Sequence, residues 1–304
     1  MKAIVTGGAG FIGSHLVEAL INKGMQVHVI DNYSTGKQSF LHPLAIPHHI
    51  DICSKEAKNV ILQEKPDYLF HLAAQADVER STLNPDQDAN VNITGTINLL
   101  EASKEASVKK FIFSSTSAVY GNTSNKIIKE DNPTLPLSFY GLSKLSAENY
   151  IKMYSSLFNV PYTILRYGNV YGPRQTAKGE GGVIAVFLEK IKNNGRLKIH
   201  GDGTQTRDYI YVKDVANANI AAIENGDNGT FQISTGTSTS ILDLISTLDA
   251  IHKEDLHYFH SNERIGDIKH SCLDNLKARE DLKWTPSYNI QKGIEETYAF
   301  AITH

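Results

Sequence analysis

Short apolar runs alternate with longer amphipathic stretches through the first half of the chain. Runs at residues 3–6, 26–30, 68–72, 110–114 and 162–166 predict strands. Between them, apolar positions recur at helical spacing in residues 12–22, 55–64, 88–106 and 140–157. Because strands and helices alternate, this half is typical of a parallel sheet covered by helices.

The second half is less regular. We expect a helix at 183–193, a strand at 197–200, a turn at 201–203, and then strands at 208–212 and 231–234 around a helix at 214–224. The whole pattern predicts an α/β fold: a Rossmann-type doubly wound parallel sheet with a smaller, intertwined α/β C-terminal domain. We place the first domain at 1–168 plus about 207–234, and the second at about 169–206 plus 235–304.

Composition narrows the class of protein. The 304 residues are 41% hydrophobic and 21% charged, as in an ordinary globular protein, and the formal charge of -3 argues against a nucleic-acid partner. No apolar segment approaches the roughly 20 residues that span a bilayer. We therefore expect no membrane association and a cytoplasmic location.

Neither the cysteines nor the histidines form a metal-ligand pattern. Cys53 and Cys272 are the only cysteines and are far apart, which favours two reduced thiols over a disulfide or zinc site. His42, His48 and His49 crowd one stretch, but neighbours in an extended segment point to opposite faces. We expect a surface loop there and no metal.

A glycine-rich turn follows the first expected strand and opens the first expected helix. Gly7, Gly10 and Gly13 permit a tight turn, close approach of backbone N–H groups to a pyrophosphate, and helix packing on the strand. Asp31, at the end of the second strand, stands where a carboxylate binds an adenosine ribose diol and repels a 2′-phosphate. Together, the glycine turn and Asp31 predict binding of NAD rather than NADP. The alternative is an ordinary turn with a surface aspartate.

Two further segments lie where this cofactor would bind. Asp51 and Ile52 precede the third strand-helix repeat and are candidates for the adenine pocket. Leu72, Ala73, Ala74 and Gln75 follow the next strand, where small residues allow close passage of the chain. Simple packing explains either segment equally well.

A tyrosine and a lysine four residues apart are the main catalytic candidates. On a helix, such a lysine would stabilise the tyrosinate and depress its pKa. The spacing occurs four times, in Tyr33…Lys37, Tyr140…Lys144, Tyr209…Lys213 and Tyr288…Lys292. Only Tyr140…Lys144 begins an expected helix after a strand that ends in hydroxyls, Ser114-Ser115-Thr116. Because ligands bind beyond the carboxyl ends of parallel strands, we expect this pair beside the cofactor.

Together, the glycine turn, Asp31, Leu72–Gln75, Asn92–Thr96, Ser114–Thr116 and Tyr140…Lys144 resemble the extended short-chain dehydrogenase/reductase family. Residues 166–174, 201–212 and 264–267 resemble its nucleotide-sugar branch, most closely UDP-hexose 4-epimerases. The resemblance implies that Thr116, Tyr140 and Lys144 are catalytic, with Asn92 supporting the helix or proton path near Lys144. The cofactor set that it implies is Gly7, Gly10, Phe11, Ile12, Gly13, Asp31, Asn32, Asp51, Ile52, Leu72, Ala73, Ala74, Gln75, Asn92, Tyr140, Lys144 and Tyr167.

The residues after Thr116 distinguish between reactions of this branch. The dehydratases carry an Asp-Glu pair there and the decarboxylases a glutamate at the second position, whereas this chain has Ser117-Ala118. Without those acids, elimination lacks its general acid and base. Asp31 disfavours the NADP-dependent reductases. Epimerisation remains, and by this resemblance Tyr140 would remove the C4 hydroxyl proton, directly or through Thr116, while NAD would take a hydride and later return it to the other face.

The resemblance also implies a UDP-sugar pocket in the second domain. Arg207 and Arg264 would grip the diphosphate, Asp267 the uridine ribose, and Asn169 the diphosphate and sugar. Further substrate contacts are expected from Thr116, Tyr140, Val183, Leu197, Lys198 and Ser271. Ser271 occupies a position where a bulky tyrosine excludes N-acetylated sugars, so the resemblance implies that UDP-GlcNAc and UDP-GalNAc are accepted beside UDP-Glc and UDP-Gal. A surface role and a substrate role for Arg174 stay equally open.

Two alternatives share this machinery. A UDP-glucuronate 4-epimerase would need a cation for the C6 carboxylate, for which Arg174 is the candidate. A non-catalytic NAD-binding regulator would be expected to lack the tyrosine or the lysine, and both are present. By resemblance alone, helices 88–106 and 140–157 predict a homodimer.

Overall fold

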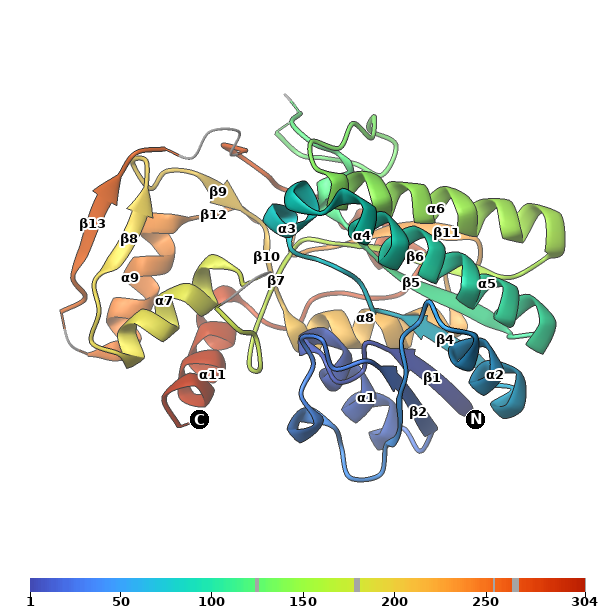
Figure 1. Cartoon of the computed structure of the whole chain (residues 1–304). Helices are drawn as coiled ribbons and strands as arrows, with labels where there is room; N and C mark the ends of the chain where they lie inside the picture. Colours follow the sequence, from blue (N-terminus) through green and yellow to red (C-terminus); the bar gives the residue numbers. More distant parts are fainter. Residues whose placement is uncertain (124–125, 178–180, 254, 264–267, 304) are drawn as a thin grey trace.

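The computed structural model describes residues 1–123, 126–177, 181–253, 255–263 and 268–303, and its main feature is a seven-stranded parallel sheet (Figure 1). The strand order is β11-β6-β5-β4-β1-β2-β3, and every neighbouring pair is parallel. The strands are β1 (Lys2–Thr6), β2 (Gln26–Asp31), β3 (Ile46–His49), β4 (Tyr68–His71), β5 (Lys110–Thr116), β6 (Tyr162–Tyr167) and β11 (Gly229–Ile233). Since the chain returns to the centre of the sheet after β3, the doubly wound fold is confirmed.

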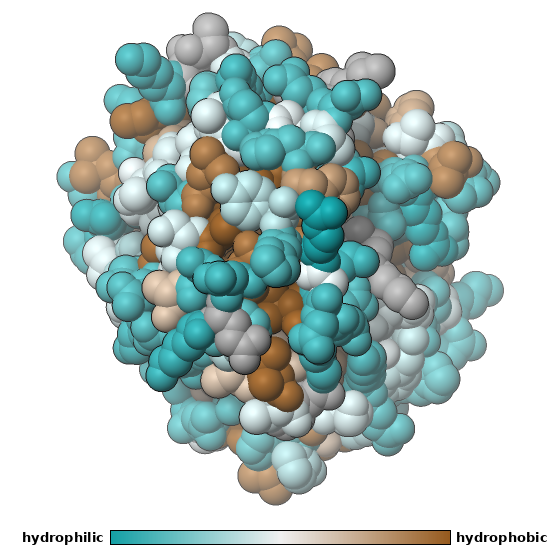
Figure 2. All heavy atoms as spheres, turned by 90° about the vertical axis from the view of Figure 1, so that its left-hand side faces the viewer, coloured by the Kyte–Doolittle hydropathy of each residue, from teal (hydrophilic) through white to brown (hydrophobic). Residues whose placement is uncertain are grey.

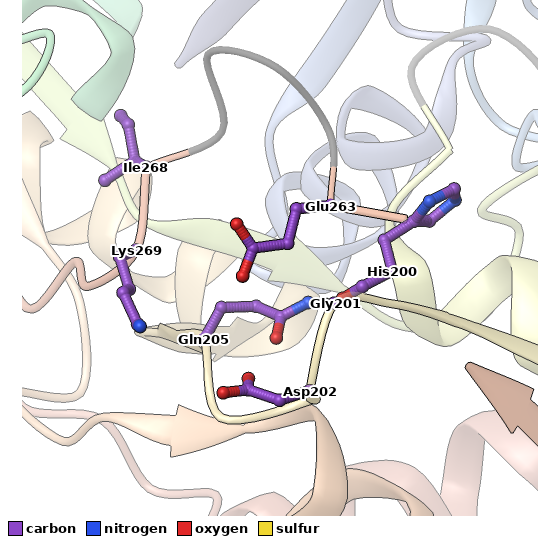
Figure 3. Close-up of a pocket in the computed structure, with 7 residues that line it drawn as sticks. All are labelled: His200, Gly201, Asp202, Gln205, Glu263, Ile268 and Lys269. Atoms are coloured by element: carbon purple, nitrogen blue, oxygen red, sulfur yellow. Dashed lines mark hydrogen bonds between the residues drawn. The ribbon is translucent and has the colours of Figure 1, made fainter. Parts of the chain in front are cut away.

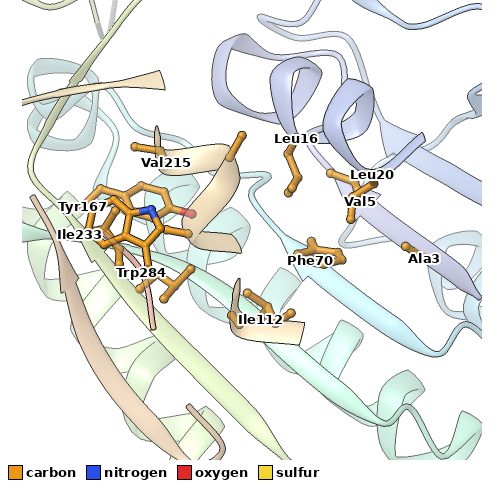
Figure 4. Close-up of a cluster of buried hydrophobic side chains, with 14 of the residues drawn as sticks. Ala3, Val5, Leu16, Leu20, Phe70, Ile112, Tyr167, Val215, Ile233 and Trp284 are labelled. Carbon is orange, nitrogen blue, oxygen red and sulfur yellow. The ribbon is translucent and has the colours of Figure 1, made fainter. Parts of the chain in front are cut away.

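Helices cover both faces of this sheet, because alternate residues of each strand point to opposite sides. Ala3 and Val5 of β1 pack under α1 (Phe11–Asn22) and α8 (Val212–Glu224), as Figure 4 shows. Ile4, between them, packs on the other side, which α2 (Lys55–Glu64), α5 (Gly95–Ala106) and α6 (Phe139–Phe158) cover. The carboxyl ends of the strands are thereby left open to a ligand.

In its described residues, the smaller region contains three two-stranded sheets and three helices. Its strand pairs are β7 (Asn169–Tyr171) with β10 (Tyr209–Tyr211), β9 (Thr206–Arg207) with β12 (Thr239–Ser240), and β8 (Leu197–His200) with β13 (Tyr258–Ser261). Its helices are α7 (Val183–Lys192), α9 (Ile241–His252) and α11 (Ile290–Thr303). A separate apolar cluster joins them. On the face in Figure 2, apolar side chains run between hydrophilic ones, and β13 exposes Tyr258 and Phe259.

The helix expected at 88–106 is interrupted. The structure has α4 (Pro85–Ala89), then a π-helical turn (Asn90–Thr94), and then α5. A π turn widens the helix locally and is frequent at functional sites. Here it contains Asn92, whose amide bonds are described below. The other helices and strands expected from the sequence are confirmed to within about two residues at each end, including the strand expected at 208–212, which is β10.

The surface loop expected around His48 and His49 is wrong, because these residues belong to the edge strand β3. His48 lies beside His28 of β2, with Nε2 3.0 Å from Nδ1 of His28. Pairing with β2 stabilises this strand. Because the segment is mostly exposed, its sequence has no apolar pattern from which a strand could be predicted. The sequence patterns also do not predict several helices and strands that the structure contains: α3 (Val78–Leu83), α9, α10 (Leu276–Glu280), α11, β7, β9, β12 and β13.

Residues on each side of the expected domain boundaries pack in the core of the other region. Trp284, expected in the second domain, packs in the core under the large sheet (Figure 4), and its indole donates to the Asp214 carbonyl of α8. Conversely, Tyr209 and Tyr211 pack in the apolar cluster of the smaller region. Within the described ranges, no helix is long and apolar enough to span a bilayer.

Candidate active site

The glycine turn between β1 and α1 leaves backbone donors free at a helix end. Gly7 has φ +69°, and a Cβ on Gly13 would lie 2.1 Å from the Gly7 carbonyl oxygen, so both positions require glycine. Gly10 caps α1 without a side-chain hydrogen bond. Because the first N–H groups of a helix have no intrahelical partner, this end of α1 can bind an anion.

Asp31 lies at the end of β2, beside this turn. One carboxylate oxygen accepts from the backbone N–H of Ala9 at 2.9 Å and the other from that of Tyr33 at 2.8 Å. These bonds fix the carboxylate, and each oxygen keeps a lone pair for a ligand hydroxyl. An acceptor at this position fits a ribose diol.

A long cleft runs along the carboxyl ends of the strands, and thirteen of the expected cofactor residues line it. They are Gly7, Gly10, Phe11, Ile12, Gly13, Asp31, Asn32, Asp51, Ile52, Leu72, Ala73, Ala74 and Gln75. The cleft also reaches Ser114 of β5, two residues before Thr116. The structure therefore joins the glycine turn to the hydroxyl-bearing strand end.

The sequence interpretation missed several residues of this cleft. Thr35 and Gly36 line it because their loop folds over the glycine turn, with Lys37 N–H donating to the Ala9 carbonyl. The small residues Ser34, Thr35 and Gly36, shortly after Asp31, are a usable signal in the sequence. Thr176 comes from the second half of the chain and Arg80 from α3, and neither has a local motif.

The start of α6, the helix that carries Tyr140 and Lys144, packs on the end of β5, the strand that carries Thr116. Thr116 ends β5, and its hydroxyl accepts from the Ala118 N–H at 3.1 Å. A Cβ on Gly141 would lie 2.7 Å from the Ala118 carbonyl oxygen, so the start of α6 lies directly on this turn. One helical turn after Tyr140, the ammonium of Lys144 lies 4.4 Å from the ring centre of Phe113 in β5.

Asn92 connects the cleft to α6. Its amide oxygen accepts from the Gln75 N–H, and its amide nitrogen donates to the Gln75 carbonyl and to the Ser143 hydroxyl, at 2.9, 2.9 and 3.0 Å. Asp88 accepts from the amides of both Gln75 and Asn92. Asn92 therefore supports α6 next to Lys144, although it does not line the cleft.

The Tyr167 side chain is not available to a ligand. It is buried in the core, and the side chains of Asn219 and Tyr167 share a hydrogen bond, with the Asn219 amide donating to the phenol at 2.8 Å. Burial raises the pKa of Tyr167 to about 12, against the opposing effect of hydrogen bonds from Asn219 and Ser114. Any cofactor contact of this residue would have to come from its main chain.

None of the four Tyr…Lys pairs is part of the cleft lining itself, and the other three lack the setting of Tyr140…Lys144. Tyr33 is in a loop with φ +55°, and Tyr209 is in β10, as expected. Lys292 instead lies over the Tyr288 ring, 4.3 Å from its centre, at the start of α11. Tyr140…Lys144 alone combines the helix, the strand-end hydroxyl and the neighbouring cleft.

Two expected substrate residues lie side by side in the smaller region. The Ser271 N–H donates to the carbonyl of Thr206, the residue before Arg207. Both Arg207 and Ser271 are partly buried. Asn169 is exposed at the start of β7, and its N–H donates to the carbonyl of Asp208, so it is close to the same segment.

The remaining substrate expectations have different outcomes. Alternation along β8 turns Leu197 into the core and leaves Lys198 exposed, and the substrate contacts of both stay predictions. Val183 begins α7 and packs partly against the same cluster. Arg264 and Asp267 lie outside the described residues.

A small pocket lies at the turn after β8 (Figure 3). The side chains of Asp202, Gln205, Glu263 and Lys269 gather around it, with His200, Gly201 and Ile268 completing its lining. It adjoins the strand that carries Lys198. Mixed charges and a carboxamide make it suited to a polar ligand group.

Arg174 is bound within the protein in this structure. It has φ +71°, and its guanidinium donates to Glu18 of α1 at 3.0 Å. The contact ties the segment after β7 to the glycine-turn helix. It favours a structural role for Arg174 over the carboxylate-binding role considered above.

This site combines a cleft lined by residues expected to bind a dinucleotide, the tyrosine and lysine Tyr140 and Lys144 on one helix face, and the hydroxyl of Thr116 at a strand end. The uncapped end of α1 and the fixed Asp31 carboxylate fit the pyrophosphate and ribose of NAD, and the carboxylate would repel the phosphate of NADP. The tyrosine, lysine and hydroxyl are suited to proton transfer at a substrate alcohol.

Known proteins are similar to this chain over most of its length. The model of the NAD dependent epimerase/dehydratase family matches residues 3–234. A putative UDP-glucose 4-epimerase of Methanocaldococcus jannaschii is 40% identical over 96% of this chain and 95% of its own length.

Two solved structures have nearly the same fold as this chain. UDP-glucose 4-epimerase of Thermotoga maritima, solved with UDP-glucose, is 42% identical with a TM-score of 0.96 over 99% of this chain and 98% of that one. UDP-N-acetylglucosamine 4-epimerase of Methanobrevibacter ruminantium, solved with UDP-N-acetylmuramic acid, is 37% identical with a TM-score of 0.95 and the same coverage.

Proposed function

The chain belongs to the NAD-dependent epimerase/dehydratase family, and on that premise we propose that it inverts C4 of a UDP-hexose through a transient 4-keto sugar. The observation that supports the proposal is the packing of the start of α6, the helix of Tyr140 and Lys144, on the turn that follows Thr116 at the end of β5, the strand whose Ser114 lines the cofactor cleft. The substrates named for the similar proteins support UDP-Glc and UDP-Gal as one substrate pair.

NAD is the cofactor, and this chain has the groups to hold it. The N–H groups at the start of α1 would bind the pyrophosphate and Asp31 the adenosine ribose, while Asp51 and Ile52 would border the adenine. When bound, NAD supplies a reversible acceptor for the C4 hydride.

The chain's own residues would manage the proton and hold the sugar. Lys144 stabilises Tyr140 as a tyrosinate, which takes the C4 hydroxyl proton directly or through Thr116. The same phenol returns the proton after the keto sugar has turned. Arg207 would bind the diphosphate, and Asn169 would contact the diphosphate and sugar.

The turn after Thr116 favours epimerisation over the other reactions of the family. Ser117 and Ala118 occupy this turn, so it offers no carboxyl group for elimination or decarboxylation. With only a tyrosine and a hydroxyl at C4, oxidation and re-reduction of that carbon is the chemistry that the residues can complete.

Replacing the proposed base tests the assignment. Tyr140→Phe should lower the epimerisation rate by at least about a hundredfold, the usual share of a general base, while the protein stays folded and binds NAD. Tyr33→Phe, in a loop of the same cleft region, is the matched control and should keep normal turnover. Wild-type turnover by Tyr140→Phe would remove Tyr140 from the mechanism.

We also propose that N-acetylated UDP-hexoses are substrates. The support is the small Ser271 side chain next to Thr206 and Arg207. A uronic sugar is the second candidate, but the cation considered for its carboxylate, Arg174, is paired with Glu18. A non-catalytic regulator is disfavoured because the tyrosine and lysine are both present.

A homodimer through α6 is our proposal for the assembly, and the cytoplasmic location stays a prediction. The support is an apolar stripe on α6, where Leu142, Met153 and Leu157 are at least half exposed. Light scattering should give twice the chain mass, and Met153→Glu with Leu157→Glu should give a monomer because it charges the stripe. Leu242→Glu, an exposed apolar position on α9, is the control; a double variant that stays dimeric would contradict the proposal.

A further inference from the structure

A buried histidine links two threonines below the cofactor cleft. His71 ends β4, between Thr6 of β1 and Phe113 of β5 in the strand register, and is 1% exposed. Its Nδ1 lies 2.8 Å from the Thr6 hydroxyl, and its Nε2 lies 2.9 Å from the Thr96 hydroxyl. All three side chains are buried, so each polar atom needs its partner.

Backbone groups at the two ends fix the direction of these hydrogen bonds. The Ala73 N–H donates to the Thr6 hydroxyl at 3.2 Å, and the Thr96 hydroxyl donates to the Asn92 carbonyl at 2.6 Å. Since Thr96 has used its proton, it accepts from Nε2–H of His71. The neutral imidazole then accepts at Nδ1 from the Thr6 hydroxyl, and every bond runs from Ala73 to Asn92.

The imidazole is held neutral by its surroundings. Burial lowers the pKa of His71 well below its usual range, and the nearby ammonium of Lys144 lowers it further. The Phe113 ring lies between the two, 5.5 Å from the His71 ring and 4.4 Å from the Lys144 ammonium. A second proton would also reverse the bond at Nδ1 and take away the acceptor of the buried Thr6 hydroxyl proton.

The ends of this chain of bonds reach the two sides of the proposed active site. Ala73 lines the cofactor cleft, whereas Asn92 bonds to Ser143 of the catalytic helix. We propose that His71, as a neutral Nε2–H imidazole, is a positioning residue that aligns the cofactor segment Leu72–Gln75 with the π-helical turn and α6. Its effect on turnover rests on the proposed function, whereas its tautomer and its effect on cofactor retention do not.

Two substitutions distinguish the effect of the His71–Thr6 hydrogen bond from the effect of the His71–Thr96 hydrogen bond. In His71→Asn, the amide oxygen can replace Nδ1 as acceptor for Thr6, but the donor to Thr96 is lost. In His71→Gln, the amide nitrogen can replace Nε2 as donor to Thr96, but the acceptor for Thr6 is lost. His28→Gln is the matched control. His28 is also buried in the sheet, but its hydrogen bond to His48 is not part of the series of bonds from Ala73 to Asn92.

The experiment measures NAD retained after gel filtration, turnover of the NAD-loaded enzyme, and thermal stability. We expect His71→Asn to retain NAD but lose about tenfold or more in kcat, and His71→Gln to retain several-fold less NAD while keeping most of its kcat when saturated. The control should change neither. Equal behaviour of the two His71 variants in both measurements, altered or unaltered, would overturn the proposal.

The tautomer provides a readout that needs no catalysis. In wild-type holoprotein labelled with 15N-histidine, and with the signal assigned by its loss in His71→Gln, His71 should show a neutral Nε2–H ring at pH 6 and pH 8. An Nδ1–H ring or a charged ring would overturn the proposal even in an inactive protein. Failure of the proposed function alone would appear as wild-type inactivity with the expected tautomer and the expected NAD retention.

Discussion

At the scale of single residues, we propose that the small side chain of Ser271 sets the substrate range. It lies beside the segment that carries Arg207, the proposed diphosphate contact, and is partly buried there. Ser271→Tyr should lower kcat/KM for UDP-GlcNAc by about tenfold or more, because the larger ring would occupy the space of the acetamido group. The rate with UDP-Gal should stay within a few-fold of the wild-type rate.

Steady-state rates on both sugar pairs measure this effect. Ser271→Ala is the control, since it keeps the space and should accept both pairs. Equal losses on both pairs in Ser271→Tyr would mean that the position affects folding or the diphosphate rather than the sugar substituent.

At the scale of elements, a buried ion pair fastens the catalytic helix to the sheet. Arg166 of β6 donates to both carboxylate oxygens of Glu148 in α6, at 2.9 and 2.6 Å, and the Ser115 hydroxyl donates to the same carboxylate at 2.6 Å. Glu148 lies one turn after Lys144, and Ser115 precedes Thr116. The pair therefore keeps the helix and strand that carry the proposed catalytic groups together.

Breaking this pair should be costly. Arg166→Met leaves the buried Glu148 carboxylate with only the more distant, partly exposed ammonium of Lys152, 3.7 Å away, and should lower the free energy of unfolding by about 3 kcal/mol in denaturant titrations. Arg166→Met with Glu148→Leu should recover most of that loss, because no charge stays buried. Lys213→Met breaks the surface pair with Glu296 and should cost less than about 1 kcal/mol. A double variant as unstable as Arg166→Met would contradict this explanation.

At the scale of the whole molecule, buried histidines make stability depend on pH. Burial lowers the pKa of His15 in α1 to about 4, against the opposing effect of its bond to the Pro173 carbonyl. An unfolded histidine has a pKa of about 6.5, so below that pH the unfolded chain takes up a proton that the folded chain refuses. The free energy of unfolding should fall as the pH falls from 6.5 towards 4.

Urea titrations at pH 7.5 and pH 5 measure this loss. His15 should account for a loss of about 2 kcal/mol in the free energy of unfolding at pH 5. His15→Gln should remove this loss, because glutamine keeps a donor for the Pro173 carbonyl but does not titrate. The same slope in His15→Gln and wild type would assign the pH dependence to other groups.

Local pattern was enough to predict the sheet and its helices, because buried parallel strands have continuous apolar runs and the covering helices have an apolar face. The same holds for Gly7, Gly13 and Asp31, whose roles depend on residues close in sequence. Contacts between distant segments had no such signal: β3 depends on pairing with β2, and Thr176 and Arg80 reach the cleft only in the folded chain. His71 lacked a signal for the same reason, since its partners are 65 and 25 residues away.

The most direct test of the account is product identification with the wild-type protein. NAD-loaded enzyme, without further NAD, should convert UDP-Gal to UDP-Glc and UDP-GalNAc to UDP-GlcNAc, identified by NMR of the sugar C4 position, with no net consumption of the cofactor. Equilibrium mixtures of the two C4 epimers are the predicted result. An unchanged C4 with every UDP-hexose tested, or a dehydrated or decarboxylated sugar as product, would contradict the account.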